Sequence, residues 1–291
     1  PLSGNRYEHI HVRLTSAILG RRHSRKGVPA SLVELLRNSP ERLLMAERND
    51  ILKKIGEWLQ PENFQDYCPN GLQVEGTSEI NTVISGVTAS KALIEAAIEA
   101  NADMILVHHG YFWKGEDQRI QGMKRERLKQ LLDNDINLVA YHLPLDDHPD
   151  YGNNRQLANI LNIKNPRPLG GLVWEGELEE AMSPEKFGLH IARQLHREPL
   201  WVGEGPAAIK RVGWCTGAAQ GFINTALDAG LDAYISGEIS EPTTHTAREC
   251  GIHYYAAGHH ATERYGVQAL GKALVEEFGV THKFIDCDNP V

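Results

Sequence analysis

Two stretches of this chain, 83–110 and 212–239, can be laid on each other without a gap. Each reads as strand, glycine turn, helix and strand, and Asp103 in the first copy coincides with Asp232 in the second. The helical part of both copies has apolar residues at the same offsets, which is typical of a helix with one buried face. We therefore expect an α/β protein of two related halves that arose by internal duplication. A chance match between two common units is the alternative.

The predicted strands that matter most are three short runs rich in β-branched or aromatic residues, at 104–107, 136–140 and 252–257. Such runs are typical of buried parallel strands. Parallel strands end at a shared sheet edge, where ligands of α/β proteins bind. If the halves are related by a pseudo-twofold axis, His108 and His109 lie across a shared cleft from Gly237 and Glu238.

We expect four segments along the chain. They are an N-terminal extension (1–44), a first α/β half (45–165), a linker with a small accessory unit (166–210) and a second α/β half (211–291). The extension has eight Lys and Arg residues against three acids. We expect it to be non-native or disordered, with Met45 as the true start. The alternative is an organelle-targeting presequence.

Charge and cysteine content narrow the function classes. The 247 residues after position 44 contain 35 acids and 22 Lys and Arg residues, which argues against broad binding to nucleic acid but leaves room for a local basic groove. No run approaches the roughly 18 apolar residues that span a membrane. The four cysteines form no CxxC pair, as expected for a protein of the reducing cytoplasm.

Histidines and acids follow all three predicted strands. Neutral imidazole and carboxylate are the ligands that a divalent cation takes when no thiolate is offered. Each group alone has an ordinary explanation: a core histidine, a turn aspartate, or a surface pair four residues apart on a helix. Their coincidence at three strand ends favours a metal site. The candidate ligands are His108, His109, Asp146, His259 and Glu263.

Five donors are too many for one zinc ion with an open position and too few to saturate two ions. We therefore expect two incompletely filled divalent cations with a bridging carboxylate such as Glu263, and open positions for water or substrate. Zn, Fe, Mn and Ni suit these ligands about equally. His142, Asp147, His148 and His260 are left to orient ligands or move protons, with their individual roles open.

Five motifs, at 67–76, 86–90, 107–115, 142–146 and 258–264, give a family resemblance. From about Met45 to its end the chain resembles the GTP cyclohydrolase 1 type 2 homologue family of YbgI-like dinuclear-metal proteins. The resemblance implies a two-metal centre at the five residues named above. It also implies a ring-shaped homohexamer with its metal sites facing an internal cavity. Relatives more often have a small residue where Asp147 stands, so the resemblance leaves open which of two adjacent aspartates binds metal.

Our first hypothesis is a metal-dependent hydrolase in which two cations lower the pKa of a bridging water. Candidate small-molecule substrates are a purine nucleotide ring, a phosphoester and an amide. The sequence lacks a P-loop and a GxGxxG motif, so any nucleotide must be held by other means. The alternatives are a non-catalytic, metal-binding or partner-recruiting ring assembly and, third, a ring that threads nucleic acid through a basic channel.

Overall fold

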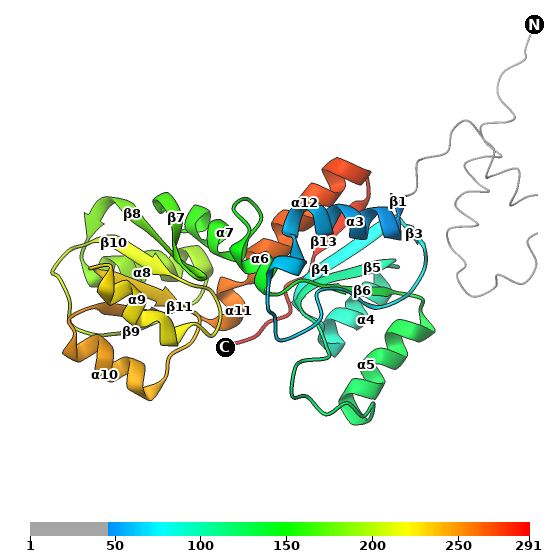
Figure 1. Cartoon of the computed structure of the whole chain (residues 1–291), viewed down its shortest axis with the longest axis horizontal. Coiled ribbons are helices and arrows are strands. Elements are labelled where there is room, and N and C mark those ends of the chain that lie inside the picture. Colours follow the sequence, from blue (N-terminus) through cyan, green and yellow to red (C-terminus); the bar gives the residue numbers. More distant parts are fainter. Residues whose placement is uncertain (1–45) are drawn as a thin grey trace, which may run out of the picture. The chain divides into compact units, whose positions relative to one another are not determined.

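The computed structural model describes residues 46–291, and their core consists of two large β-sheets with helices packed around them (Figure 1). The first sheet has the strand order β13-β4-β5-β6-β2, and the second has the order β7-β8-β10-β11-β12-β9. The predicted α/β class is confirmed. Within residues 46–291, no helix is both long and apolar enough to cross a membrane. The prediction for residues 1–44 falls outside the described residues.

The first sheet has three parallel central strands, β4, β5 and β6, with β13 parallel to β4 and β2 antiparallel to β6. Its strands are β2 (Gly71–Val74), β4 (Thr82–Thr88), β5 (Met104–His109), β6 (Asn137–Ala140) and β13 (Thr281–Phe284). The helices packed on it are α3 (Arg48–Leu59), α4 (Lys91–Glu99), α5 (Gly122–Asp133) and α12 (Arg264–Phe278). This part of the chain also contains a short antiparallel pair of strands, β1 (Ala46–Glu47) and β3 (Glu79–Ile80), and the turn η1 (Pro61–Asn63).

Both faces of the first sheet are covered, which explains why its strands are apolar throughout. Met104 and Leu106 of β5 belong to the core cluster that includes α3 and α12 residues. Ile105 and Val107 belong to the cluster on the opposite face, which includes α4 and α5 residues. Because successive side chains of a strand point to opposite faces, a strand covered on both sides has no polar alternation.

The second sheet also has three parallel central strands, β10, β11 and β12, with antiparallel strands outside them. Its strands are β7 (Lys164–Gly170), β8 (Val173–Met182), β9 (Leu200–Val202), β10 (Ile209–Trp214), β11 (Ala233–Ser236) and β12 (His253–Ala256). The remaining helices are α6 (Leu143–Asp147), α7 (Asn153–Ile160), α8 (Pro184–Leu195), α9 (Ile223–Asp228), α10 (Glu241–Glu249) and α11 (His259–Thr262), with the turn η2 (Gln220–Phe222).

The segment 166–210, predicted as a linker with an accessory unit, supplies β8, β9 and most of β7 to the second sheet. It also contains helix α8, whose N-terminus is capped by the Ser183 side chain. Near the C-terminus, α12 and β13 return to the first sheet, although the sequence placed them in the second half. Strand pairing shows which strands share a sheet, but it does not define domain boundaries. The predicted boundaries at residues 165 and 210 therefore remain predictions.

The aligned aspartates Asp103 and Asp232 make the same contacts in the two sheets. Asp103 Oδ2 accepts hydrogen bonds from the backbone amides of residues 81 and 82, at 2.9 and 3.0 Å. Asp232 Oδ2 accepts from the amides of residues 210 and 211, at 2.8 and 2.7 Å. Each carboxylate therefore fixes the start of the first parallel strand of its sheet. This correspondence supports the predicted duplication.

Replacing either aspartate by alanine leaves two strand-entry amides without their acceptor. We expect Asp103→Ala and Asp232→Ala each to lower the free energy of unfolding by about 1–3 kcal/mol, measured by urea denaturation. Asp228→Ala is the control, because the Asp228 side chain is exposed. Its free energy of unfolding is expected to stay within about 0.5 kcal/mol of the parent value. Equal stability of all three variants would contradict the assigned role.

Candidate metal centre

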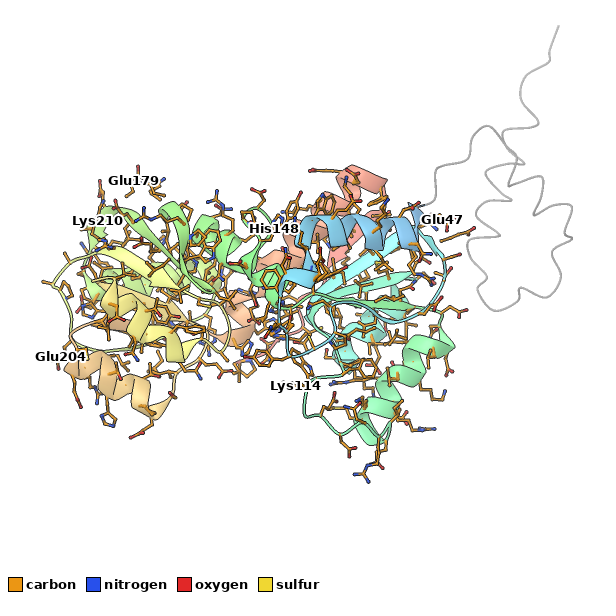
Figure 2. The ribbon with its side chains drawn as sticks, viewed as in Figure 1. Glu47, Lys114, His148, Glu179, Glu204 and Lys210 are labelled. Carbon is orange, nitrogen blue, oxygen red and sulfur yellow. The ribbon has the colours of Figure 1, made fainter. Side chains whose placement is uncertain are left out.

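The five predicted metal ligands come together at the ends of three parallel strands. β5 ends in His108 and His109, and Asp146 lies in α6, which begins three residues after β6. His259 begins α11, which follows β12, and Glu263 comes directly after that helix. The site therefore takes side chains that follow strands of both sheets. Outer residues such as Glu179 and Lys210 lie at the far end of the second sheet (Figure 2).

The donor atoms form two groups that share the Glu263 carboxylate. His108 Nε2 lies 3.4 Å from Asp146 Oδ1 and 3.6 Å from Glu263 Oε1. The other oxygen, Oε2, lies 3.2 Å from His109 Nε2 and 3.2 Å from His259 Nε2. Bonds of about 2.0–2.2 Å to one cation place neighbouring ligand atoms roughly 3–3.5 Å apart. The spacing of each group therefore fits one divalent cation.

Two buried atoms of this cluster lack a hydrogen-bond partner among the described residues. They are His108 Nε2 and Glu263 Oε2, and both belong to side chains that are almost fully buried. A buried polar atom left without a partner costs about 1–3 kcal/mol. A cation in each group would satisfy both atoms, so the residues present fit a pair of metal ions.

Each of the three histidines uses Nδ1 to bond a neighbouring group, which leaves Nε2 for the site. The Nδ1 bonds are His108 to the Tyr141 carbonyl (2.9 Å), His109 to Thr88 Oγ1 (3.1 Å) and His259 to Glu238 Oε1 (2.7 Å). Such partners fix the ring orientation and the tautomer that a metal ligand needs. The position of Glu238, whose role the sequence left open, is thereby explained.

Of the two adjacent aspartates, Asp146 faces the cluster. Its Oδ1 accepts hydrogen bonds from Asn153 Nδ2 (3.0 Å) and Thr216 Oγ1 (3.2 Å), which hold it beside His108. Asp147 belongs to none of the donor groups found among residues 46–291. Burial raises the pKa of the Asp147 carboxyl. The structure thus supports Asp146 as the candidate ligand.

The charges of the cluster are strongly coupled. Burial alone would lower the pKa of His108, but the carboxylates of Asp146 and Glu263 raise it to about 9. The pKa of His259 is also about 9, because Glu263 and Glu238 outweigh its burial. Burial lowers the pKa of His109 to about 4. Without a cation, His108 and His259 therefore hold protons at neutral pH, which partly offset the carboxylate charges of the cluster.

Sequence reasoning missed Asp66, which lies next to the cluster through His142. Asp66 Oδ1 is 2.6 Å from His142 Nδ1, and the pair is separated by 76 positions, so no local spacing indicates it. Two other candidates point elsewhere. His260 Nε2 bonds Asp286 Oδ1 at 2.8 Å, and His148 Nδ1 accepts from the backbone amides of residues 150 and 151.

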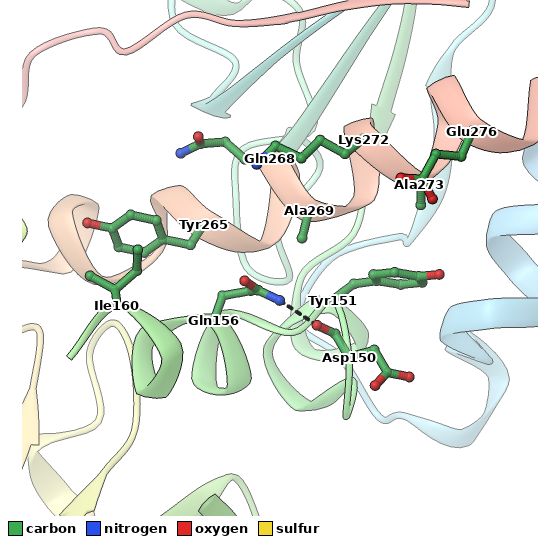
Figure 3. Close-up of a pocket in the computed structure, with 10 residues that line it drawn as sticks. All are labelled: Asp150, Tyr151, Gln156, Ile160, Tyr265, Gln268, Ala269, Lys272, Ala273 and Glu276. Carbon is green, nitrogen blue, oxygen red and sulfur yellow. Dashed lines mark hydrogen bonds between the residues drawn. The ribbon is translucent and has the colours of Figure 1, made fainter. Parts of the chain in front are cut away.

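A separate pocket of about 390 Å³ lies between α7 and α12 and contains none of the candidate metal ligands (Figure 3). On the α7 side of the pocket, the Gln156 side chain donates to the Asp150 carbonyl. Tyr265 and Lys272 of α12 line the other side. The donor cluster is therefore distinct from this pocket.

Space for the shared carboxylate depends on Gly217. A Cβ there would lie 2.1 Å from Glu263 Oε1 and 3.2 Å from His259 Nε2, and the residue has φ +69°. We expect Gly217→Ala to weaken metal binding at least tenfold, measured by competition with a chelator. Gly279→Ala is the matched control, because Gly279 has φ +68° and no atom within 4 Å of the added Cβ. Equal loss in both variants would assign the effect to backbone strain.

Metal binding must displace the proton of His108, whose pKa is about 9. Below that pH the proton competes with the cation, so affinity falls as pH falls. We expect metal affinity to rise by up to about tenfold per released proton for each unit from pH 6 to pH 8. Titration calorimetry in buffers of different ionisation enthalpy measures the proton release. An affinity that stays constant over this range would contradict the charge assignment.

Comparison with known proteins shows the family. Residues 46–290 match the family described as Duf34/NIF3 (NGG1p interacting factor 3). A Pseudomonas aeruginosa protein named "GTP cyclohydrolase 1 type 2 homolog" is 55% identical over 245 residues, which are 82% of this chain and 97% of that protein. A protein of the same name from Escherichia coli K12 is 50% identical over 245 residues, covering 84% and 99% of the two chains.

Solved structures agree with this assignment. The structure titled "Structural genomics, protein ybgI, unknown function" superposes with a TM-score of 0.83 at 49% identity, covering 84% of this chain and all of that one. Protein TTHA1606 from Thermus thermophilus gives a TM-score of 0.79 at 30% identity with the same coverage. The chain therefore belongs to the Duf34/NIF3 family.

Proposed function

We propose that this protein binds two divalent cations and acts as a metal-dependent hydrolase. The observation that carries the proposal is the shared carboxylate of Glu263, whose two oxygens face two separate donor groups. One group consists of His108, Asp146 and Glu263. The other consists of His109, His259 and Glu263. Zn, Fe, Mn and Ni all suit these ligands.

Each cation has three protein donors in this arrangement, so at least one position of each stays open for water or substrate. When bound there, two divalent cations would lower the pKa of a coordinated water and would polarise a substrate oxygen. The surrounding residues hold the donor side chains in place and leave the site accessible from one side. His108 is fully buried, whereas the His109 and His259 side chains are 17% and 27% exposed. Substrate therefore approaches from the side of His109 and His259.

Metal content tests the two-cation assignment directly. Elemental analysis is expected to give two ions per chain for the parent and none for Glu263→Ala, which removes the shared ligand. Asp146→Ala and His259→Ala each remove a donor from one group, so each is expected to retain one ion. His245→Ala is the control, because His245 forms an exposed pair with Glu241 at the same four-residue spacing. A parent with one ion or none would contradict the proposal.

Turnover is tested on the full chain loaded in turn with Zn, Fe, Mn or Ni. The candidate substrates are a purine nucleotide such as GTP, a panel of phosphoesters and a panel of amides. We expect metal-dependent hydrolysis of at least one class, with a loss of at least a hundredfold in Glu263→Ala. Full metal content without turnover in any class would contradict the hydrolase and leave the binding site standing.

The greater exposure of His109 and His259 also supports a second function, a metal-binding assembly that delivers an ion or recruits a partner without turnover. The cation on that side would exchange faster than the one beside buried His108. Transfer of metal to an acceptor protein distinguishes this function from hydrolysis. The ring-shaped homohexamer rests on the family resemblance, and light scattering of the purified protein tests it.

A further inference from the structure

The loop that follows β5 brings an indole ring next to the candidate metal centre. The Trp113 ring centroid lies 5.9 Å from that of His109 and 5.0 Å from that of His142. The His142 ring in turn lies 5.0 Å from the ring of His108. Trp113 and His142 thus lie directly beside the cluster. Neither is one of the five candidate ligands, although His142 also forms a donor group with His108 and His109.

The loop holds Trp113 in place at a cost in backbone strain. Phe112, directly before it, has φ +66°, a strained conformation for a bulky residue and one that concentrates at functional sites. Lys124 Nζ lies over the Phe112 ring at 5.0 Å and pairs with Glu116 at 3.3 Å. Glu116 Oε2 accepts from the Trp113 amide at 3.1 Å. This network offsets the strain and fixes the direction of the indole.

His142 is fixed from the opposite side by Asp66. The Asp66 carboxylate is 3% exposed and accepts hydrogen bonds from the His142 ring and three further groups. Those groups are the Tyr67 amide, Asn70 Nδ2 and the Leu143 amide. Because His142 Nδ1 donates to Asp66, its Nε2 is left as a hydrogen-bond acceptor. The backbone amide of Lys114 donates to the Tyr67 carbonyl at 2.6 Å and joins this segment to the Trp113 loop.

We propose that Trp113 and His142 form a substrate subsite beside the candidate metal centre, which binds a planar heteroaromatic ring carrying an N–H donor. The proposal deepens the proposed function and rests on it. The half-buried indole offers an aromatic surface to a flat ring, and every nucleobase has such a face. His142 Nε2 accepts from the ring edge. Two divalent cations would balance the four carboxylates of Asp66, Asp146, Glu238 and Glu263, so the site would carry no net negative charge that repels a phosphate.

The test measures how much a ring adds to binding. The probes are GMP and ribose 5-phosphate, which share the sugar phosphate and differ in the guanine ring. Calorimetry on the full chain loaded with zinc is expected to show GMP binding at least tenfold more tightly. Trp113→Ala is expected to reduce this preference to twofold or less, and Trp113→Phe to keep most of it. Trp201→Ala, at a partly exposed tryptophan of β9, is expected to keep all of it.

Tryptophan fluorescence gives a second measurement. GMP is expected to quench the parent emission, and Trp113→Phe is expected to lose that quenching while still binding GMP. Equal affinity for the two probes in the parent, or an unchanged preference in Trp113→Ala, would overturn the subsite. Zinc content separates the two proposals. Full zinc content without a preference for GMP would contradict the subsite alone. A preference for GMP without paired metal ions or turnover would contradict the proposed function alone.

Discussion

The shared carboxylate of Glu263 is the contact on which the candidate site depends. It is almost fully buried, and a buried charge is tolerated only when it is paired. Its partners come from both sheets, since His108 and His109 end β5 and His259 begins the helix after β12. The two sheets are therefore joined through this group of charges. Attraction to the imidazoles of His108 and His109 lowers the pKa of Glu263 well below its usual range, although burial alone would raise it.

Two glycines that follow strands β10 and β12 make this contact possible. Gly258, with φ +102°, ends the turn after β12, so that α11 starts at His259 and brings Glu263 round by one helical turn. Gly217 leaves room for the carboxylate. The two donor groups that result are unequal. The His108 side chain is enclosed, and the His259 side chain is more exposed and lies on the side through which we propose that substrate enters.

Sequence predicted the parts of the fold that depend on local patterns. The apolar runs at 104–107, 136–140 and 252–257 are parallel strands, and the five donors that follow them do meet. These features were accessible because strand periodicity and i, i+4 spacing act over a few residues. The aspartates Asp103 and Asp232 were aligned by sequence alone, and their contacts explain why the alignment needs no gap.

Features that depend on distant pairing were not predictable in the same way. Nothing local indicates that β13 pairs with β4, or that the segment 166–210 extends the second sheet. Asp66 binds a histidine 76 positions away, and Asn153 and Thr216 orient Asp146 from different elements. These contacts form only when the strands have been brought together, so propensity and spacing carry no signal for them.

Anomalous X-ray diffraction from crystals of the metal-loaded protein tests the shared carboxylate most directly. If Glu263 is shared by two cations, the map will contain two peaks about 3.5–4 Å apart, one on each side of the carboxylate, with His108 and Asp146 at one peak and His109 and His259 at the other. A single peak, or metal bound away from Glu263, would contradict this sharing.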